Sequence, residues 1–146
     1  MNDIETPVYF EFYHSTYRVD TTPDGSLAGY LLNLRTGRID EDNSRIRAVL
    51  HAREEDIEVV SEDRYIELTE ARRAHHLRGD GPIFALYETI QAIHDAADQE
   101  SRSLEPAEDA MIKITRARTF RMWEQEFARR DAGEPPSFRF WPVSSG

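Results

Sequence analysis

The chain contains no cysteine, which excludes several kinds of site at once. Without thiols it has no disulfide framework, no cysteine nucleophile and no thiolate site for zinc or iron–sulfur clusters. A chain of 146 residues is still long enough to form its own core, since domains of this size bury about 70% of the surface of the unfolded chain. We therefore expect a single domain over residues 1–146 that folds without covalent or metal staples.

Long apolar runs are missing as well. Residues 1–5 lack the basic and apolar stretches of a secretion signal, and no later segment is apolar enough to cross a membrane. The sequence also lacks a glycine-rich phosphate loop, a G-x-G-x-x-G fingerprint, an H-E-x-x-H pair and a G-x-S-x-G elbow. We accordingly expect a cytoplasmic protein with no membrane partner, no cofactor and no metal ion.

Lysine is nearly absent, because Lys113 is the only lysine among 18 basic residues. This arginine bias is typical of a GC-rich bacterial, archaeal or phage genome. The net charge of −10 argues against general nucleic-acid binding, because a phosphate backbone requires a basic field. The charge is uneven, with −6 over residues 81–112 and +4 over residues 113–130. The basic stretch either pairs within the molecule or forms a local basic patch.

The hydrophobic pattern predicts an α+β fold with a small antiparallel sheet of about three strands in the N-terminal half. Alternating apolar residues predict one long strand over 8–19, a second over 27–35 and a third over 57–60. Residues 45–53 favour a short helix with Ile46, Val49 and Leu50 inward, and the alternative is a strand with Ile46, Ala48 and Leu50 on one face. The segment 61–77 fits either one helix or a strand followed by a helix.

Two longer helices are predicted between Gly79 and Arg130, joined at residues 101–105. Pro82 and Pro106 suit first helical positions, where a missing N–H is not needed. The short linker favours an antiparallel helix pair. We expect the sheet to pack against this pair, and residues 134–146 to pack on the domain as an extended aromatic tail.

The second of these helices carries two apolar stripes that differ by about a third of a turn, at about 100° per residue. The stripes consist of Ala110, Ile114 and Ala117 and of Phe120, Trp123 and Phe127. Either both stripes pack inside the domain, or the aromatic one is a binding surface, since aromatic residues and arginine are enriched in interfaces. The binding hypothesis requires Trp123 and Phe127 to be exposed in the isolated chain. Its candidate residues are Arg116, Phe120, Trp123, Phe127, Phe138, Phe140 and Trp141.

No catalytic residue can be assigned from the sequence, and the candidates are His14, His75 and His76. His14 could act as a general base if the first strand borders a cleft. His75 and His76 point about 100° apart on a regular helix, so they cannot readily hold one ion together. His94 and Asp98 are spaced i and i+4, which we interpret as a solvated pair. A hydrolase would require a pocket that gathers at least two histidines or carboxylates.

These features favour a small acidic binding or regulatory protein that acts through protein–protein contacts, for example by neutralising a basic partner. Two alternatives stay open. One is a small hydrolase with a histidine-containing cleft, and the other is a structural homo-oligomer built on the second long helix. Association with a partner that weakens as salt rises would identify the binding protein. A pocket that gathers histidines would identify the hydrolase, and sedimentation of the chain as an oligomer would identify the structural homo-oligomer.

Overall fold

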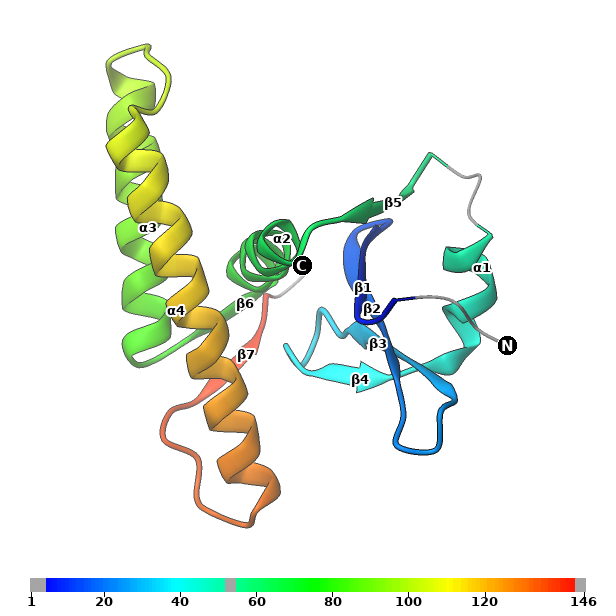
Figure 1. The fold of residues 1–146 in the computed structure, drawn as a ribbon. Helices are drawn as coiled ribbons and strands as arrows, with labels where there is room; N and C mark the ends of the chain where they lie inside the picture. Colours follow the sequence, from blue (N-terminus) through cyan, green and yellow to red (C-terminus); the bar gives the residue numbers. More distant parts are fainter. Residues whose placement is uncertain (1–4, 52–54, 144–146) are drawn as a thin grey trace.

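The computed structural model describes residues 5–51 and 55–143, and over these residues the chain has an α+β fold (Figure 1). A five-stranded antiparallel sheet has the strand order β4-β3-β2-β1-β5. The predicted class is confirmed, but the sheet is larger than the expected three strands. Its strands are β1 (Val8–Phe12), β2 (Ser15–Thr21), β3 (Leu27–Leu32), β4 (Ile39–Glu41) and β5 (Ile57–Val60).

The long strand predicted over 8–19 is a hairpin of two strands. The chain reverses at Tyr13, which has a φ of 53°, and Phe10 on β1 then pairs with Tyr17 on β2. The buried apolar side chains lie at even positions in β1 and at odd positions in β2. In one continuous strand, that switch would place them on opposite faces. The shift of the buried residues from even to odd positions is therefore the sequence signal for the turn between β1 and β2.

One face of the sheet is covered by α1 (Ile46–Leu50), which follows the short 3₁₀ turn η1 (Asn43–Arg45). The helix predicted over 45–53 is confirmed to residue 50, and residues 52 and 53 lie outside the described ranges. The core on this side consists of Phe10, Phe12, Tyr17, Val19, Val49 and Ile57.

A close approach inside this core requires glycine at position 29. A Cβ atom there would lie 1.7 Å from the hydroxyl oxygen of Tyr17. The missing side chain lets the Tyr17 hydroxyl pass over β3 and donate a hydrogen bond to the Asp42 carbonyl. Gly29 thereby permits the contact between β2 and the segment that leads into η1.

The other face of the sheet is covered by α2 (Glu62–His76), so a single helix accounts for the ambiguous segment 61–77. The contacts between α2 and the sheet are largely polar. The hydroxyls of Thr16 and Thr69 lie 2.7 Å apart, and Arg72 pairs with Glu11 at 3.1 Å. Because polar residues make many of these contacts, apolar residues recur only weakly along α2. The sequence pattern therefore does not show that α2 is a central layer.

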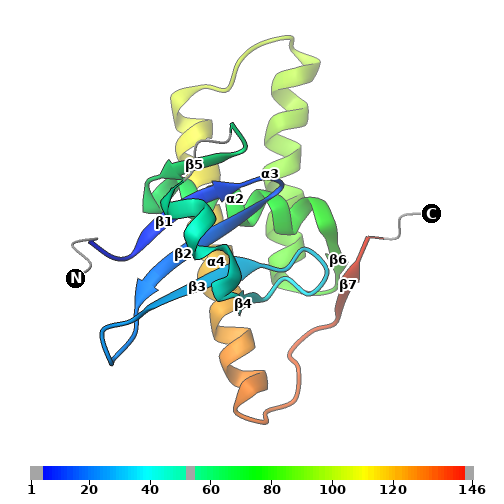
Figure 2. The ribbon, with the colours of Figure 1, turned by 90° about the vertical axis from the view of Figure 1, so that its right-hand side faces the viewer.

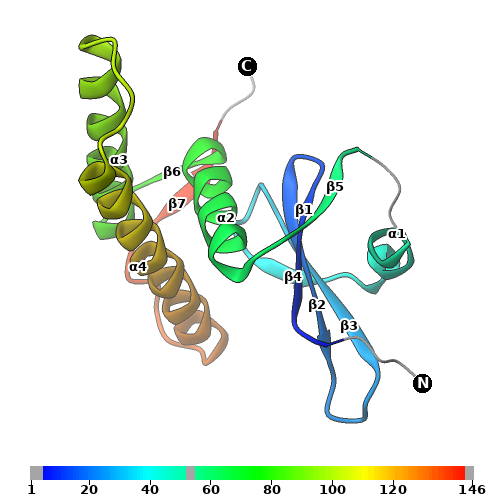
Figure 3. The ribbon, with the colours of Figure 1, turned by 45° about the horizontal axis from the view of Figure 1, so that its top comes forward.

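The antiparallel pair α3 (Pro82–Gln99) and α4 (Pro106–Asp131) lies on the far side of α2 (Figures 1 and 3). The expectation that the sheet packs against the pair holds only in part, since α2 lies between most of the sheet and the pair, while Arg38 beside β4 reaches Asp131 of α4 at 3.0 Å. The pair begins after Gly81, the N-cap of α3. Its linker end projects beyond the sheet and α2 (Figure 2). Among the described residues, no helix is long and apolar enough to cross a membrane.

The part of the predicted tail that the structure describes, residues 134–143, returns to the helices as an extended segment, and residues 144–146 lie outside the described ranges. Its strand β7 (Phe140–Pro142) pairs antiparallel with β6 (Leu77–Gly79), so that Trp141 lies opposite Arg78. Phe138 and Phe140 pack against a second core between β6, α3 and α4. That core consists of Leu77, Ile83, Phe84, Tyr87, Trp123 and Phe127.

Candidate functional site

α4 buries one face from Ile112 to Phe127. The buried residues are Ile112, Thr119, Phe120, Trp123, Glu126 and Phe127, and at about 100° per residue they fall within about a third of a turn. The two apolar stripes expected from the sequence are thus not two packing faces. Ile114, which we expected to pack in the first stripe, is 68% exposed. The polar residues Thr119 and Glu126 continue the buried face, and a search for apolar residues alone does not detect them.

The aromatic stripe of α4 belongs to the core. Trp123 is fully buried and Phe127 is 9% exposed, so the exposure that the binding hypothesis required of them is not met. The Trp123 indole N–H donates to the Tyr87 hydroxyl at 2.7 Å. Phe120 is also buried. The ring of Trp123 packs edge-on against Phe84, Phe138 and Phe140.

The remaining candidates for binding lie in different surroundings. Phe138 and Phe140 are partly buried against the second core, whereas Trp141 on β7 is 48% exposed. Arg116 is half-buried beside Glu67, with 3.9 Å between the Arg116 Nη1 and Glu67 Oε1 atoms. The structure therefore does not bring the seven expected binding residues together in one exposed surface.

An exposed apolar surface exists on the opposite side of α4, which we call the α4 outer face. It consists of Ala107, Ala110, Met111 and Ile114. Met111 is 55% exposed, and Ile114 borders an open groove of about 210 Å³ between α2 and α4. Clustered exposed apolar side chains of this kind are typical of interaction sites. The groove is lined by Asp63, Ile66, Glu67, Lys113, Ile114 and Ala117.

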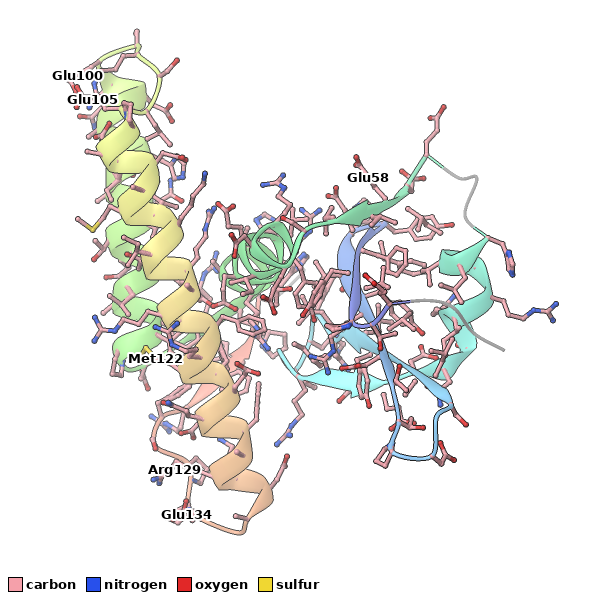
Figure 4. All side chains as sticks on the ribbon, viewed as in Figure 1. Glu58, Glu100, Glu105, Met122, Arg129 and Glu134 are labelled. Carbon is pink, nitrogen blue, oxygen red and sulfur yellow. The ribbon has the colours of Figure 1, made fainter. Side chains whose placement is uncertain are left out.

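Carboxylates surround the α4 outer face. Residues 95–113 hold six acidic residues and two basic ones, and Glu100 and Glu105 lie at the projecting end of the helix pair (Figure 4). Both basic residues are already paired: Arg102 with Glu100 at 2.9 Å and Glu108 at 2.7 Å, and Lys113 with an aspartate of α4 at 3.0 Å. Hydrogen bonds from Arg102, and then from the Glu105 backbone N–H, lower the pKa of Glu108 to about 2. The apolar surface thus has a negatively charged border.

The candidate catalytic histidines are only partly gathered. The rings of His75 and His76 are 4.9 Å apart, edge to face. The pKa of His76 is lowered by burial and by the nearby charges of His75, Arg72 and His14. His14 itself is exposed in the turn after β1.

One pocket brings together two histidines that the sequence did not associate. His75 and His94 both line a cavity of about 260 Å³ between α2, α3 and α4. Within the described residues, neither imidazole has a hydrogen bond to a hydroxyl or carboxylate side chain. The pocket thus contains the two histidines that the hydrolase alternative requires, but not, among the described residues, the hydrogen bond on which a dyad of nucleophile and base depends.

Known proteins provide no further assignment. No protein-family model, curated protein or solved structure matches this chain. Across residues 5–51 and 55–143, no group of three or more histidine and acidic side chains lies close enough to hold a metal ion. The functional argument therefore rests on the surfaces and cavities of the structure.

The sequence contained a signal for the α4 outer face that we did not use. Ile112 and Ile114 are about 200° apart on a helix, so they cannot both face the same core. Trp123 and Phe127 point toward the core. By helical spacing, Ile112 points the same way and Ile114 points away from the core. Requiring a single inward direction for the whole helix identifies Ile114 as exposed.

Proposed function

We propose that this protein is a binding module whose α4 outer face accepts a basic, amphipathic segment of a partner protein. One observation carries the proposal: Met111 and Ile114 are more than half exposed, Ile114 lines an open groove, and carboxylates lie nearby. A partner with apolar side chains at its centre and basic residues at its edge matches this arrangement.

The apolar contacts supply affinity in this proposal. Burying an aliphatic side chain completely is worth about 1.5–3 kcal/mol, so Met111 and Ile114 together contribute several factors of ten before the costs of association. The carboxylates contribute mainly to the rate of encounter, which falls as salt screens their field. The proposed complex is therefore sensitive both to an apolar substitution and to ionic strength.

The alternative partner for the α4 outer face is a second copy of the same chain. Arg118 and Arg121 are exposed beyond Ile114, and two antiparallel α4 helices would place these arginines against the acidic end of the other copy. The basic-partner proposal is preferred because two carboxylates of α2, Asp63 and Glu67, line the groove, and the first turn of α4 is acidic as well. Sedimentation of the purified chain separates the two proposals.

The test compares Ile114→Glu with the matched control Gln125→Glu, which adds the same charge at an exposed position of the same helix. Each protein is used for affinity capture from the native host at low and at high salt, and the captured protein is then purified and titrated. We expect wild type and Gln125→Glu to bind one basic protein, more weakly at high salt. Ile114→Glu should bind at least about tenfold more weakly, a difference of about 1.4 kcal/mol.

Two results contradict the proposal. One is a captured partner whose affinity is the same for Ile114→Glu and for wild type. The other is a wild-type chain that sediments as a dimer and becomes a monomer on Ile114→Glu substitution, because the α4 outer face is then covered by a second copy. Circular dichroism of both variants confirms that the substitutions leave the fold intact.

A further inference from the structure

We propose that the cavity between α2, α3 and α4 is a binding site for a doubly charged, phosphate-like oxyanion, with Arg116 as its main contact. The cavity measures about 260 Å³ and opens to solvent. Four side chains that carry or can accept a positive charge line it: Arg78, Arg116, His75 and His94. This inference is independent of the α4 outer face, because none of these residues belongs to that surface.

Of the two arginines in the lining, Arg116 has the fewer side-chain hydrogen bonds. Burial lowers the pKa of its guanidinium, although Glu67 and Glu70 act in the opposite direction. Its ion pair with Glu67 is long, at 3.9 Å, and no hydrogen bond of the Arg116 side chain is present within the described residues. A guanidinium has five N–H donors. Arg116 therefore presents unused donors where water is partly excluded, which is the situation in which an oxyanion binds well.

The carboxylate at the floor of the cavity is already compensated. Glu70 accepts a charged hydrogen bond from Arg73 at 2.7 Å and another from the Tyr87 hydroxyl at 2.7 Å. Arg73 offsets most of the charge of Glu70, although Glu70 still acts to raise the pKa of Arg116, against the effect of burial. The Glu70–Arg73 pair forms a polar floor for the cavity that the guanidinium groups of Arg78 and Arg116 also line.

The second guanidinium comes from another part of the chain. Arg78 lies on β6, where one of its nitrogens donates to the carbonyls of Ala74 and Leu77. Those bonds hold the guanidinium group through its Nη1 atom and leave Nε and Nη2 without a hydrogen bond among the described residues. Two guanidinium groups on different elements match a dianion better than a single carboxylate, because each can bind two oxygens of a tetrahedral group. The imidazoles of His75 and His94 add N–H donors.

The test measures binding of inorganic phosphate to the full chain by calorimetry or by amide chemical shifts. We expect saturable binding that weakens by about tenfold or more in Arg116→Gln, because the charged bidentate contact of the guanidinium with the anion is lost. Arg118→Gln is the matched control, because Arg118 is exposed two residues away and does not line the cavity. Its affinity for phosphate should change by less than about twofold.

A second variant keeps the result interpretable if Arg116→Gln unfolds. Arg78 is exposed, so Arg78→Gln should remain folded while losing phosphate affinity by a similar factor. Glycerol phosphate tests the source of the ligand: tighter binding than phosphate indicates a phosphate monoester, and equal binding indicates free phosphate. The proposal is overturned by any of three results: no saturable binding to wild type, equal losses in Arg118→Gln and Arg116→Gln, or acetate binding as tight as phosphate.

Discussion

A buried ion pair at the centre of the molecule allows a sharp test of how this fold is stabilised. Arg73 and Glu70 on α2 are 2% and 0% exposed, and the Arg73 Nη1 and Glu70 Oε2 atoms are 2.7 Å apart. Arg73 also donates from Nε and Nη2 to the Gly37 carbonyl, at 2.9 and 2.7 Å. One side chain thus connects α2 to the turn after β3 and neutralises a fully buried carboxylate.

The perturbation is Arg73→Met, which keeps a long apolar side chain and removes the charge and the donors. Glu70 is then left buried with only the Tyr87 hydroxyl as a hydrogen-bond donor, and breaking a buried pair in this way costs about 3–5 kcal/mol. The Gly37 carbonyl loses both hydrogen-bond donors, which adds about 1–3 kcal/mol to the loss of stability. The expected loss of about 4–8 kcal/mol is comparable with the roughly 5–15 kcal/mol total stability of a domain.

The assay is urea denaturation followed by circular dichroism. Arg72→Met is the matched control on the same helix, because the Arg72–Glu11 pair is 30% exposed on both side chains, and its loss should cost at most about 1 kcal/mol. The double variant Glu70→Gln with Arg73→Met should be more stable than Arg73→Met alone, since it removes the stranded charge. A loss below about 1 kcal/mol in Arg73→Met, the value of an exposed pair, would refute the reasoning.

Three further predictions concern other parts of the fold. Gly29→Ala should destabilise the chain in urea melts by about 1–3 kcal/mol, because the new methyl group overlaps the Tyr17 hydroxyl. The pKa of His76 lies below 6.5 in the folded chain, so the unfolded chain binds more protons near that pH and stability falls on acidification. His76→Gln should flatten that fall in melts above and below pH 6.5. Glu126 accepts hydrogen bonds from an arginine of α4 and from the tail, so Glu126→Ala should cost about 1.5–3 kcal/mol and speed amide exchange over residues 137–142.

The boundaries of the long helices could be predicted because they depend on neighbouring residues. Pro82 and Pro106 stand in the first turns of α3 and α4, as expected. Glu105 and Glu108 form a capping box at the start of α4, a pattern contained within four consecutive residues. Such features are local, so they are present in the sequence whatever the rest of the chain does.

The role of α2 could not be predicted, because its buried polar residues find their partners far along the chain. Arg73 bonds to Gly37, and Glu70 accepts from Tyr87. Read alone, a helix with these residues has little apolar periodicity and looks like a surface element. Only the folded chain shows that the charges are paired inside, and that α2 is the layer between the sheet and the helix pair.

The sequence by itself determined the α+β class, the absence of any thiol-dependent site, the uneven charge and the ends of the long helices. The tertiary structure decided that Trp123 points into the core, and a single inward direction for α4 then leaves Ile114 exposed. It also decided that Arg78, His94 and Arg116 line one cavity. These three residues lie on three different elements, and side chains so far apart in sequence meet only through packing, which no local pattern encodes.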